Sequence, residues 1–193
     1  SYKDGDSWKS LTYAEFSDKI HSMAAALLKY GIEPGQTVGI YSANRYEWAV
    51  TDLACTLIGA VSVPIYSTNT RDQAKFIIND ADIKIIFTGD KVQYENAASI
   101  VSEGLPLTVV SYDSSIDVDS GFAQTFNAFV SSGSPDEAMA EIDQRLARIK
   151  PDDTTTIIYT SGTTGNPKGV MLCHGNLFHQ FRAVDAKFNL TPE

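Results

Sequence analysis

The chain has 193 residues, 43% of them hydrophobic, so it is long enough to bury the core of one domain. Its formal net charge of −9 argues against nucleic acid or an anionic membrane as a direct partner of this segment. Its three histidines are scattered and it has no Cys/His cluster, which argues against a structural zinc site.

Helical and strand-like patterns alternate along the chain. Thr12 and Glu15 form a capping box, which predicts a helix that ends at Gly31. Short apolar runs predict strands at 37–41, 61–65, 83–87, 107–110 and 154–159. Amphipathic runs predict helices at 45–58, from Thr70 onward, at 92–101 and from Ser134 or Pro135 through Ile149. This alternation predicts an α/β fold, a doubly wound and mainly parallel sheet flanked by helices.

Several positions carry local predictions. Asn44 is expected to cap the helix at 45–58, with Glu47 at its third position. Thr70 is expected to cap the following helix together with Gln73. The segment 111–135 is rich in Ser, Asp and Gly and is predicted to be a loop with an amphipathic helical insert. The insert carries three phenylalanines, which we expect to anchor the core: Phe122, Phe126 and Phe129.

The most informative stretch runs from Tyr159 to Gly169, where hydroxyls, glycines and one lysine lie between two apolar runs. Glycines let backbone N–H groups approach anionic oxygens, while hydroxyls donate hydrogen bonds and Lys168 adds a positive charge. The strand at 154–159 delivers this stretch, and 169–172 can return as its partner before a helix at 174–188. Such a loop lies at a strand end, where open α/β sheets bind ligands, and its composition is typical of polyphosphate binding.

The spacing of this loop excludes a P-loop NTPase. The segment from Gly162 to Lys168 superficially resembles the P-loop pattern, but Pro167 stands where that motif needs its second glycine. Gly169 stands where the motif needs a hydroxyl that binds Mg²⁺. Because proline lacks a backbone donor and fixes φ, an anion-binding nest of the P-loop type cannot form here.

The loop instead resembles the phosphate loop of the adenylate-forming, or AMP-binding, superfamily, which includes acyl-CoA synthetases, luciferases and peptide-synthetase adenylation domains. The resemblance continues through 170–177. His174 matches the family's histidine there, whereas Cys173 replaces the usual Ser or Thr, which would cap a helix better. We assign His174 a packing or hydrogen-bonding role at the start of a helix.

Other stretches extend the resemblance. Residues 11–16 and 57–66 look like the first and second core motifs of the superfamily, in the same order. Residues 44–48 and 63–68 are similar to the long-chain fatty acyl-CoA synthetase branch. Activation of other acyl or aryl acids, and of amino acids, stays open as an alternative.

The resemblance implies a two-step reaction. A carboxylate attacks the α-phosphorus of ATP to give an acyl-adenylate and pyrophosphate, and the thiol of CoA then displaces AMP. The intact parent would be an acid–thiol ligase that uses ATP, Mg²⁺, a fatty acid and CoA. The residues that would contact the β- and γ-phosphates are Thr160, Ser161, Gly162, Thr163, Thr164, Gly165 and Lys168. Thr160 is also the expected Mg²⁺ contact, and no residue of the chain is assigned a catalytic role.

Members of the superfamily are longer and add a small C-terminal domain, so residues 1–193 are expected to form part of the large N-terminal AMP-binding domain. The later family motifs, for the acid pocket, the Mg²⁺-binding glutamate, the ribose and the C-terminal lysine, have no match here. We therefore expect an inactive fragment whose first helix, within 1–31, packs on the missing part. The alternative from another class is a non-catalytic nucleotide-binding module.

The distribution of charge and the length of the longest apolar stretch also predict what the protein binds and where it is located. Between Lys91 and Asp143 there are nine acidic residues and one basic one, whereas 150–193 has four of each, so an anionic nucleotide would meet the neutral end. Cys55 and Cys173 are expected to be reduced. The longest apolar stretch, near 53–65, is shorter than the roughly 20 residues a membrane span needs. We expect a cytoplasmic protein, with at most peripheral membrane contact through parts outside this sequence.

Overall fold

The computed structural model describes residues 1–4, 7–160 and 167–188. The strands are β1 (Tyr2–Asp4), β2 (Ser7–Lys9), β3 (Thr37–Tyr41), β4 (Val61–Ile65), β5 (Ile85–Thr88), β6 (Thr108–Ser111), β7 (Ala123–Thr125), β8 (Thr154–Thr160) and β9 (Lys168–Cys173). The helices are α1 (Tyr13–Tyr30), α2 (Tyr46–Ile58), α3 (Arg71–Asp80), α4 (Lys91–Ser102), α5 (Phe126–Ser132), α6 (Pro135–Leu146) and α7 (His174–Phe188).

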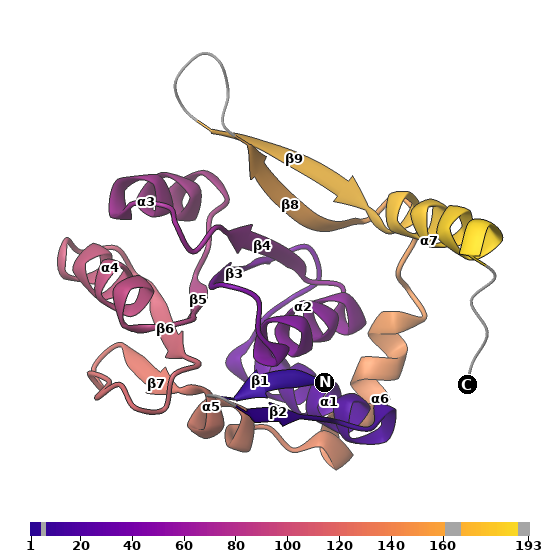
Figure 1. Ribbon diagram of the computed structural model, residues 1–193, viewed down its shortest axis with the longest axis horizontal. Coiled ribbons are helices and arrows are strands. Elements are labelled where there is room, and N and C mark those ends of the chain that lie inside the picture. The colour runs from indigo at the N-terminus through magenta and orange to yellow at the C-terminus, as the bar shows by residue number, and fades with distance from the viewer. Residues whose placement is uncertain (5–6, 161–166, 189–193) are drawn as a thin grey trace.

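A seven-stranded sheet forms the centre of the molecule, in the order β7-β6-β5-β3-β4-β8-β9 (Figure 1). The strands from β7 to β8 pair in parallel, and β9 pairs antiparallel with β8 at the edge. Because β4 and β5 lie on opposite sides of β3, the chain reverses its winding direction there. The prediction of a doubly wound, mainly parallel α/β sheet is confirmed.

Each face of the sheet packs against its own hydrophobic cluster. Strand residues alternate between the two faces, so Ile40 packs with α1, α2, α5 and α6, whereas its neighbour Tyr41 packs with α3 and α4. Phe87 and Ile86 on β5 divide in the same way. The helix α1 buries one side against α2, α5 and α6 of this same domain; its contact with a part outside the sequence stays a prediction.

The capping boxes predicted at two helix starts are confirmed. Thr12 Oγ1 accepts a hydrogen bond from Glu15 N at 3.2 Å, and Thr12 N donates to the Glu15 carboxylate at 2.8 Å. Thr70 and Gln73 make the same reciprocal pair at the start of α3. At the other end of α1, Gly31 adopts φ 98°, a left-handed conformation that glycine reaches without a side-chain clash.

Two predicted helix boundaries are wrong. Arg45, not Asn44, is the N-cap of α2, and its guanidinium, which has no acceptor atom for the helix N–H groups, pairs with Glu47 at 2.7 Å. The helix predicted to reach Ile149 ends at Leu146. The nearby Pro151 disfavours helical backbone at the residue before it, and Lys150 N instead donates to the Asp153 carboxylate at 2.7 Å.

Three short strands were not predicted: β7 lies in the segment predicted to be a loop, and β1 and β2 lie before the first predicted helix. Residues of β7 pair in parallel with β6, Val109 opposite Ala123, and β1 pairs with β2 in a separate two-stranded sheet. Three residues are too few to display an alternating pattern. Of the predicted phenylalanine insert, Phe126 and Phe129 lie in α5, while Phe122 precedes β7. Phe129 is buried, as expected for a core anchor.

None of the helices within the described ranges is long and apolar enough to span a membrane.

Candidate phosphate-binding site

The candidate site lies at the carboxyl edge of the sheet, at the end of the β8–β9 hairpin (Figure 1). Thr160 is the last residue of β8 and Lys168 the first of β9, and the two are paired across the hairpin. Both are exposed. Five of the predicted phosphate contacts lie outside the described residues: Ser161, Gly162, Thr163, Thr164 and Gly165.

The chemistry of Thr160 and Lys168 suits a polyphosphate. A hydroxyl and an ammonium group at one end of a hairpin can donate hydrogen bonds to anionic oxygens. Lys168 makes no ion pair with any described residue, so its charge is not neutralised by a carboxylate of this part of the chain. The pair could therefore meet a ligand that is itself anionic.

The described residues could hold Mg²⁺ only together with the phosphate oxygens of a bound nucleotide. The described part of the chain contains no group of three or more His, Cys, Asp or Glu side chains that could hold a metal. Mg²⁺ is usually held by one or two carboxylates together with substrate phosphates and waters, so the exposed Thr160 hydroxyl supplies one oxygen ligand at most and no carboxylate.

Gly169 lets the hairpin close tightly beside the site. It is paired with Tyr159, so the two residues face the same side of the ribbon. A Cβ at Gly169 would lie 2.8 Å from Cγ2 of Ile157 and 3.1 Å from Cζ of Tyr159. Only glycine leaves the Tyr159 ring room to lie across the hairpin.

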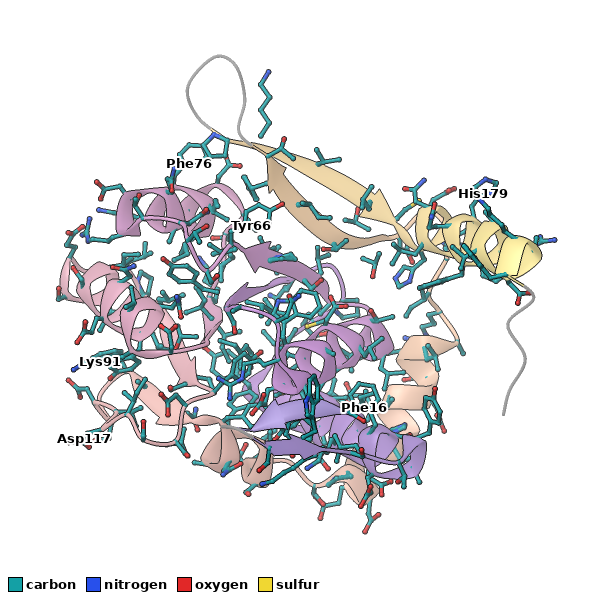
Figure 2. All side chains as sticks on the ribbon, in the orientation of Figure 1. Phe16, Tyr66, Phe76, Lys91, Asp117 and His179 are labelled. Carbon is teal, nitrogen blue, oxygen red and sulfur yellow. The ribbon has the colours of Figure 1, made fainter. Side chains whose placement is uncertain are left out.

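The turn after β4 forms a second, fixed part of this edge, and the sequence analysis assigned it no role. Asn69 N donates to Tyr66 O at 2.9 Å, and the buried Tyr41 hydroxyl donates to Asn69 O. Gln93 of α4 donates to Ser67 O at 3.0 Å. Figure 2 shows Tyr66 at this end of β4, where its side chain is 60% exposed. Burial raises the pKa of Tyr41, which keeps its hydroxyl protonated as a donor.

Arg45 contacts the segments that follow three neighbouring strands, β3, β5 and β6, on the side of the sheet away from β4. Its guanidinium makes a bidentate pair with Glu47, at 2.7 and 2.9 Å, and donates to Gly89 O at 2.7 Å. It also lies 5.3 Å from the ring centre of Tyr112. Arg45, Gly89 and Tyr112 follow β3, β5 and β6 respectively. The Arg45 side chain therefore links the carboxyl ends of these three strands. The sequence alone predicts no such role for Arg45, which there is only part of a family-like segment.

His174 lies at the end of β9 that is remote from the loop. Its backbone N–H donates to Asp153 O at 3.1 Å, and Cys173 N donates to the Asn176 side chain at 3.0 Å, which satisfies donors at the start of α7. Lys168 and His174 are six positions apart along the strand, a distance of about 19–20 Å. Burial lowers the pKa of His174, although Asp153 opposes the shift. The imidazole Nε2 of His174 is buried without a hydrogen-bond partner among the described residues, so the hydrogen bonds at this helix start come from the backbone, and the predicted side-chain role stays a prediction.

A hollow at the opposite, amino edge of the sheet does not belong to this site. It lies between α6 and the starts of β3, β4 and β8, and Gly35, Gly59 and Thr154 line it. Arg145 on its wall is already engaged, donating to Ile32 O at 2.8 Å and to Glu141 at 2.7 Å. Ligands of open parallel sheets bind at the carboxyl edge, which is where the hairpin loop begins.

Comparisons with known proteins find relatives of this chain among acyl-CoA ligases. The chain is 34% identical to the long-chain-fatty-acid–CoA ligase FadD15 of Mycobacterium bovis over 93% of this chain and 29% of the ligase. It is 36% identical to the peroxisomal long chain acyl-CoA synthetase 6 of Arabidopsis thaliana over 88% of this chain and 24% of the synthetase. The chain thus spans less than a third of the length of these relatives.

A structural likeness accompanies the sequence match. ATP-bound MatB from Rhodopseudomonas palustris superposes with a TM-score of 0.76 at 27% identity, over 96% of this chain and 34% of MatB. The family model for AMP-binding enzymes matches residues 1–193. The match of the family model to the whole length of the chain identifies it as a member of the AMP-binding enzyme family, the adenylate-forming ligases.

Proposed function

We propose that the parent protein is an ATP-dependent fatty acid–CoA ligase and that this chain supplies its pyrophosphate-binding edge. The names of the relatives support the fatty acid and CoA, because those at 30–36% identity are long-chain acyl-CoA ligases. The pairing of Thr160 with Lys168 across the hairpin end is the observation on which the phosphate assignment rests. Ser161, Gly162, Thr163, Thr164 and Gly165 complete the proposed loop.

The proposed reaction joins two anions, which is its main difficulty. The carboxylate attacks the α-phosphorus of ATP, the bond to the bridging oxygen breaks, and pyrophosphate leaves with its electron pair. Lys168 and the loop hydroxyls bind the β- and γ-phosphates, which offsets charge on the leaving group and holds it in line. Mg²⁺, with Thr160 as its proposed protein contact, would supply further charge neutralisation. The CoA thiol then displaces AMP from the acyl-adenylate.

We propose that the remaining parts of the site lie outside this chain. The acid pocket, the CoA site and a C-terminal domain belong to those parts, so residues 1–193 alone are expected to be inactive. A cytoplasmic location is proposed from the reduced state expected of Cys55 and Cys173, both of which are free thiols.

The test is ATP–pyrophosphate exchange by the full-length parent, with and without Lys168→Ala. Loss of one charged phosphate contact costs about 1.5–3 kcal/mol, so we expect kcat/KM for ATP to fall about 10- to 150-fold. Lys91→Ala is the matched control. Lys91 is an exposed lysine on α4, well away from the hairpin in Figure 2, and its change should leave exchange as it is.

The acids used in the assay distinguish the alternatives. Exchange with fatty acids, but not with aromatic acids or amino acids, supports the proposal. Exchange only with another class would reassign the substrate. A parent that binds ATP but exchanges with none of these acids is the non-catalytic module. Exchange that Lys168→Ala leaves unchanged would contradict the phosphate assignment.

A further inference from the structure

The end of β8 that carries the loop is held weakly by the backbone of the sheet. Within the described residues, β8 is in register with β4 at a single position, Ser62 opposite Thr156. Thr156 Oγ1 adds one hydrogen bond, to Ser62 O at 3.0 Å. The four residues of β8 after Thr156 pair only with β9, and Figure 1 shows this end of the hairpin projecting beyond β4.

One side chain near that end is firmly fixed. Tyr159 is 5% exposed and packs in the cluster that α3 contributes to through Ile77 and Ile78. Its hydroxyl donates a hydrogen bond of 2.6 Å to the carboxylate of Asp80, the last residue of α3. A hydrogen bond to a carboxylate is among the stronger kinds. Burial, followed by the interaction with Asp80, raises the pKa of Tyr159, so the hydroxyl stays a donor at neutral pH.

The position of Tyr159 couples this contact to the candidate site. Tyr159 directly precedes Thr160, and its partner Gly169 directly follows Lys168. A shift of the Tyr159 ring would therefore move both strands where the loop begins and ends. Within the described residues, the Tyr159–Asp80 hydrogen bond is the one hydrogen bond or ion pair that joins residues 157–160 to α3.

We propose that Tyr159, held by Asp80, is a positioning residue that fixes Thr160 and Lys168 for binding the triphosphate of ATP. This inference rests on the proposed function, because it assumes that the loop binds phosphates. Tyr159 does not touch the nucleotide in this scheme. It orients the strand ends, so that less of the binding free energy is lost in fixing Thr160 and Lys168.

The experiment uses the full-length parent with four variants: Tyr159→Phe, Asp80→Ala, Asp80→Asn and the double change Tyr159→Phe/Asp80→Ala. We measure the KM for ATP and kcat in pyrophosphate exchange, and the Kd for ATP without acid by calorimetry. Tyr159→Phe and Asp80→Ala should each raise KM and Kd about three- to tenfold, the range expected for one hydrogen bond, with kcat nearly unchanged. The double variant should be no worse than either single one. Asp80→Asn keeps an acceptor oxygen and should bind ATP much as the wild type does.

A matched control separates positioning from general stability. The Tyr112 hydroxyl, buried on the other face of the sheet, donates to Thr51 Oγ1 at 2.8 Å. Tyr112→Phe should lower the melting temperature without changing KM or Kd. If Tyr159→Phe also lowers only the melting temperature, the proposal is overturned, and exchange that still depends on Lys168 leaves the proposed function standing. A wild-type parent that neither binds ATP nor exchanges pyrophosphate overturns both.

Discussion

At the scale of single residues, the described part of the site depends on pairs that only the fold brings together. Thr160 and Lys168 could be matched from the sequence, because a hairpin around a short loop pairs its flanking residues. The contact between Tyr159 and Asp80 could not, since 79 positions separate them and no local pattern links a strand end to a helix end. The same holds for Arg45 and Gly89, which are 44 positions apart.

A pH dependence is expected from Asp52, a half-buried acid on α2. Burial raises the pKa of Asp52, although the nearby Ser62 hydroxyl, which makes no full hydrogen bond, opposes the shift. A raised pKa means that the folded state binds the proton more tightly than the unfolded state. The stability that this provides is present below the ordinary carboxyl pKa near 4 and is lost as the pH rises through the folded pKa.

Asp52→Asn should therefore raise the melting temperature at pH 7, because the amide carries no charge to desolvate. The gain should shrink as the pH falls towards 4, where the wild-type carboxyl takes up its proton. Thermal unfolding across this pH range measures both effects, with the exposed Asp18→Asn as the control. A gain that is the same at every pH would show that charge is not its cause.

At the scale of elements, the sequence predicted helix starts correctly where both residues of the capping box lie within four positions. Thr12 and Thr70 sit three positions before Glu15 and Gln73, and each pair closes as predicted. The predicted N-cap at Asn44 is wrong. Glu47, its expected partner, pairs instead with Arg45, which is itself the N-cap of α2. The strand β7 was missed because it owes its conformation to pairing with β6, not to its own three residues.

Two serine or threonine N-caps provide a matched test of this local rule. Thr70 accepts the hydrogen bond from Gln73 N, so Thr70→Ala should cost about 0.5–2 kcal/mol of unfolding free energy. Ser134 occupies the N-cap of α6 without a side-chain cap hydrogen bond, so Ser134→Ala should cost much less. Urea unfolding compares the two variants. Equal losses would mean that the capping hydrogen bond adds no stability at Thr70.

At the scale of the whole molecule, the periodic pattern of apolar runs was sufficient to predict a doubly wound sheet. The strand order required more, because the central place of β3 depends on α3 crossing back over it. The close packing between helices on one face of the sheet could not be predicted from the sequence either. The connection between α5 and α6 lies directly on α1, where a Cβ at Gly133 would approach Ala26 N to 2.5 Å and Ala25 C to 2.8 Å.

Gly133→Ala should destabilise the domain by about 1–3 kcal/mol, because backbone atoms of α1 would have to move. Gly121→Ala is the control, since its Cβ would meet only the flexible Asp119 carboxylate, at 3.2 Å. Chemical denaturation of both variants measures the difference. Similar stability for the two would mean that α5 and α6 can retreat from α1 at no cost.

The hydrogen bonds of Arg45 affect how the ends of neighbouring strands open. Gly89 N donates to Tyr41 O and Tyr112 N donates to Thr88 O, so the ends of β3, β5 and β6 are already linked in series by backbone hydrogen bonds. A guanidinium bound to both Glu47 and Gly89 O adds a cross-link over that series. Fraying of one strand end therefore breaks contacts at its neighbours, and the three should exchange their amide protons with solvent as a single cooperative unit.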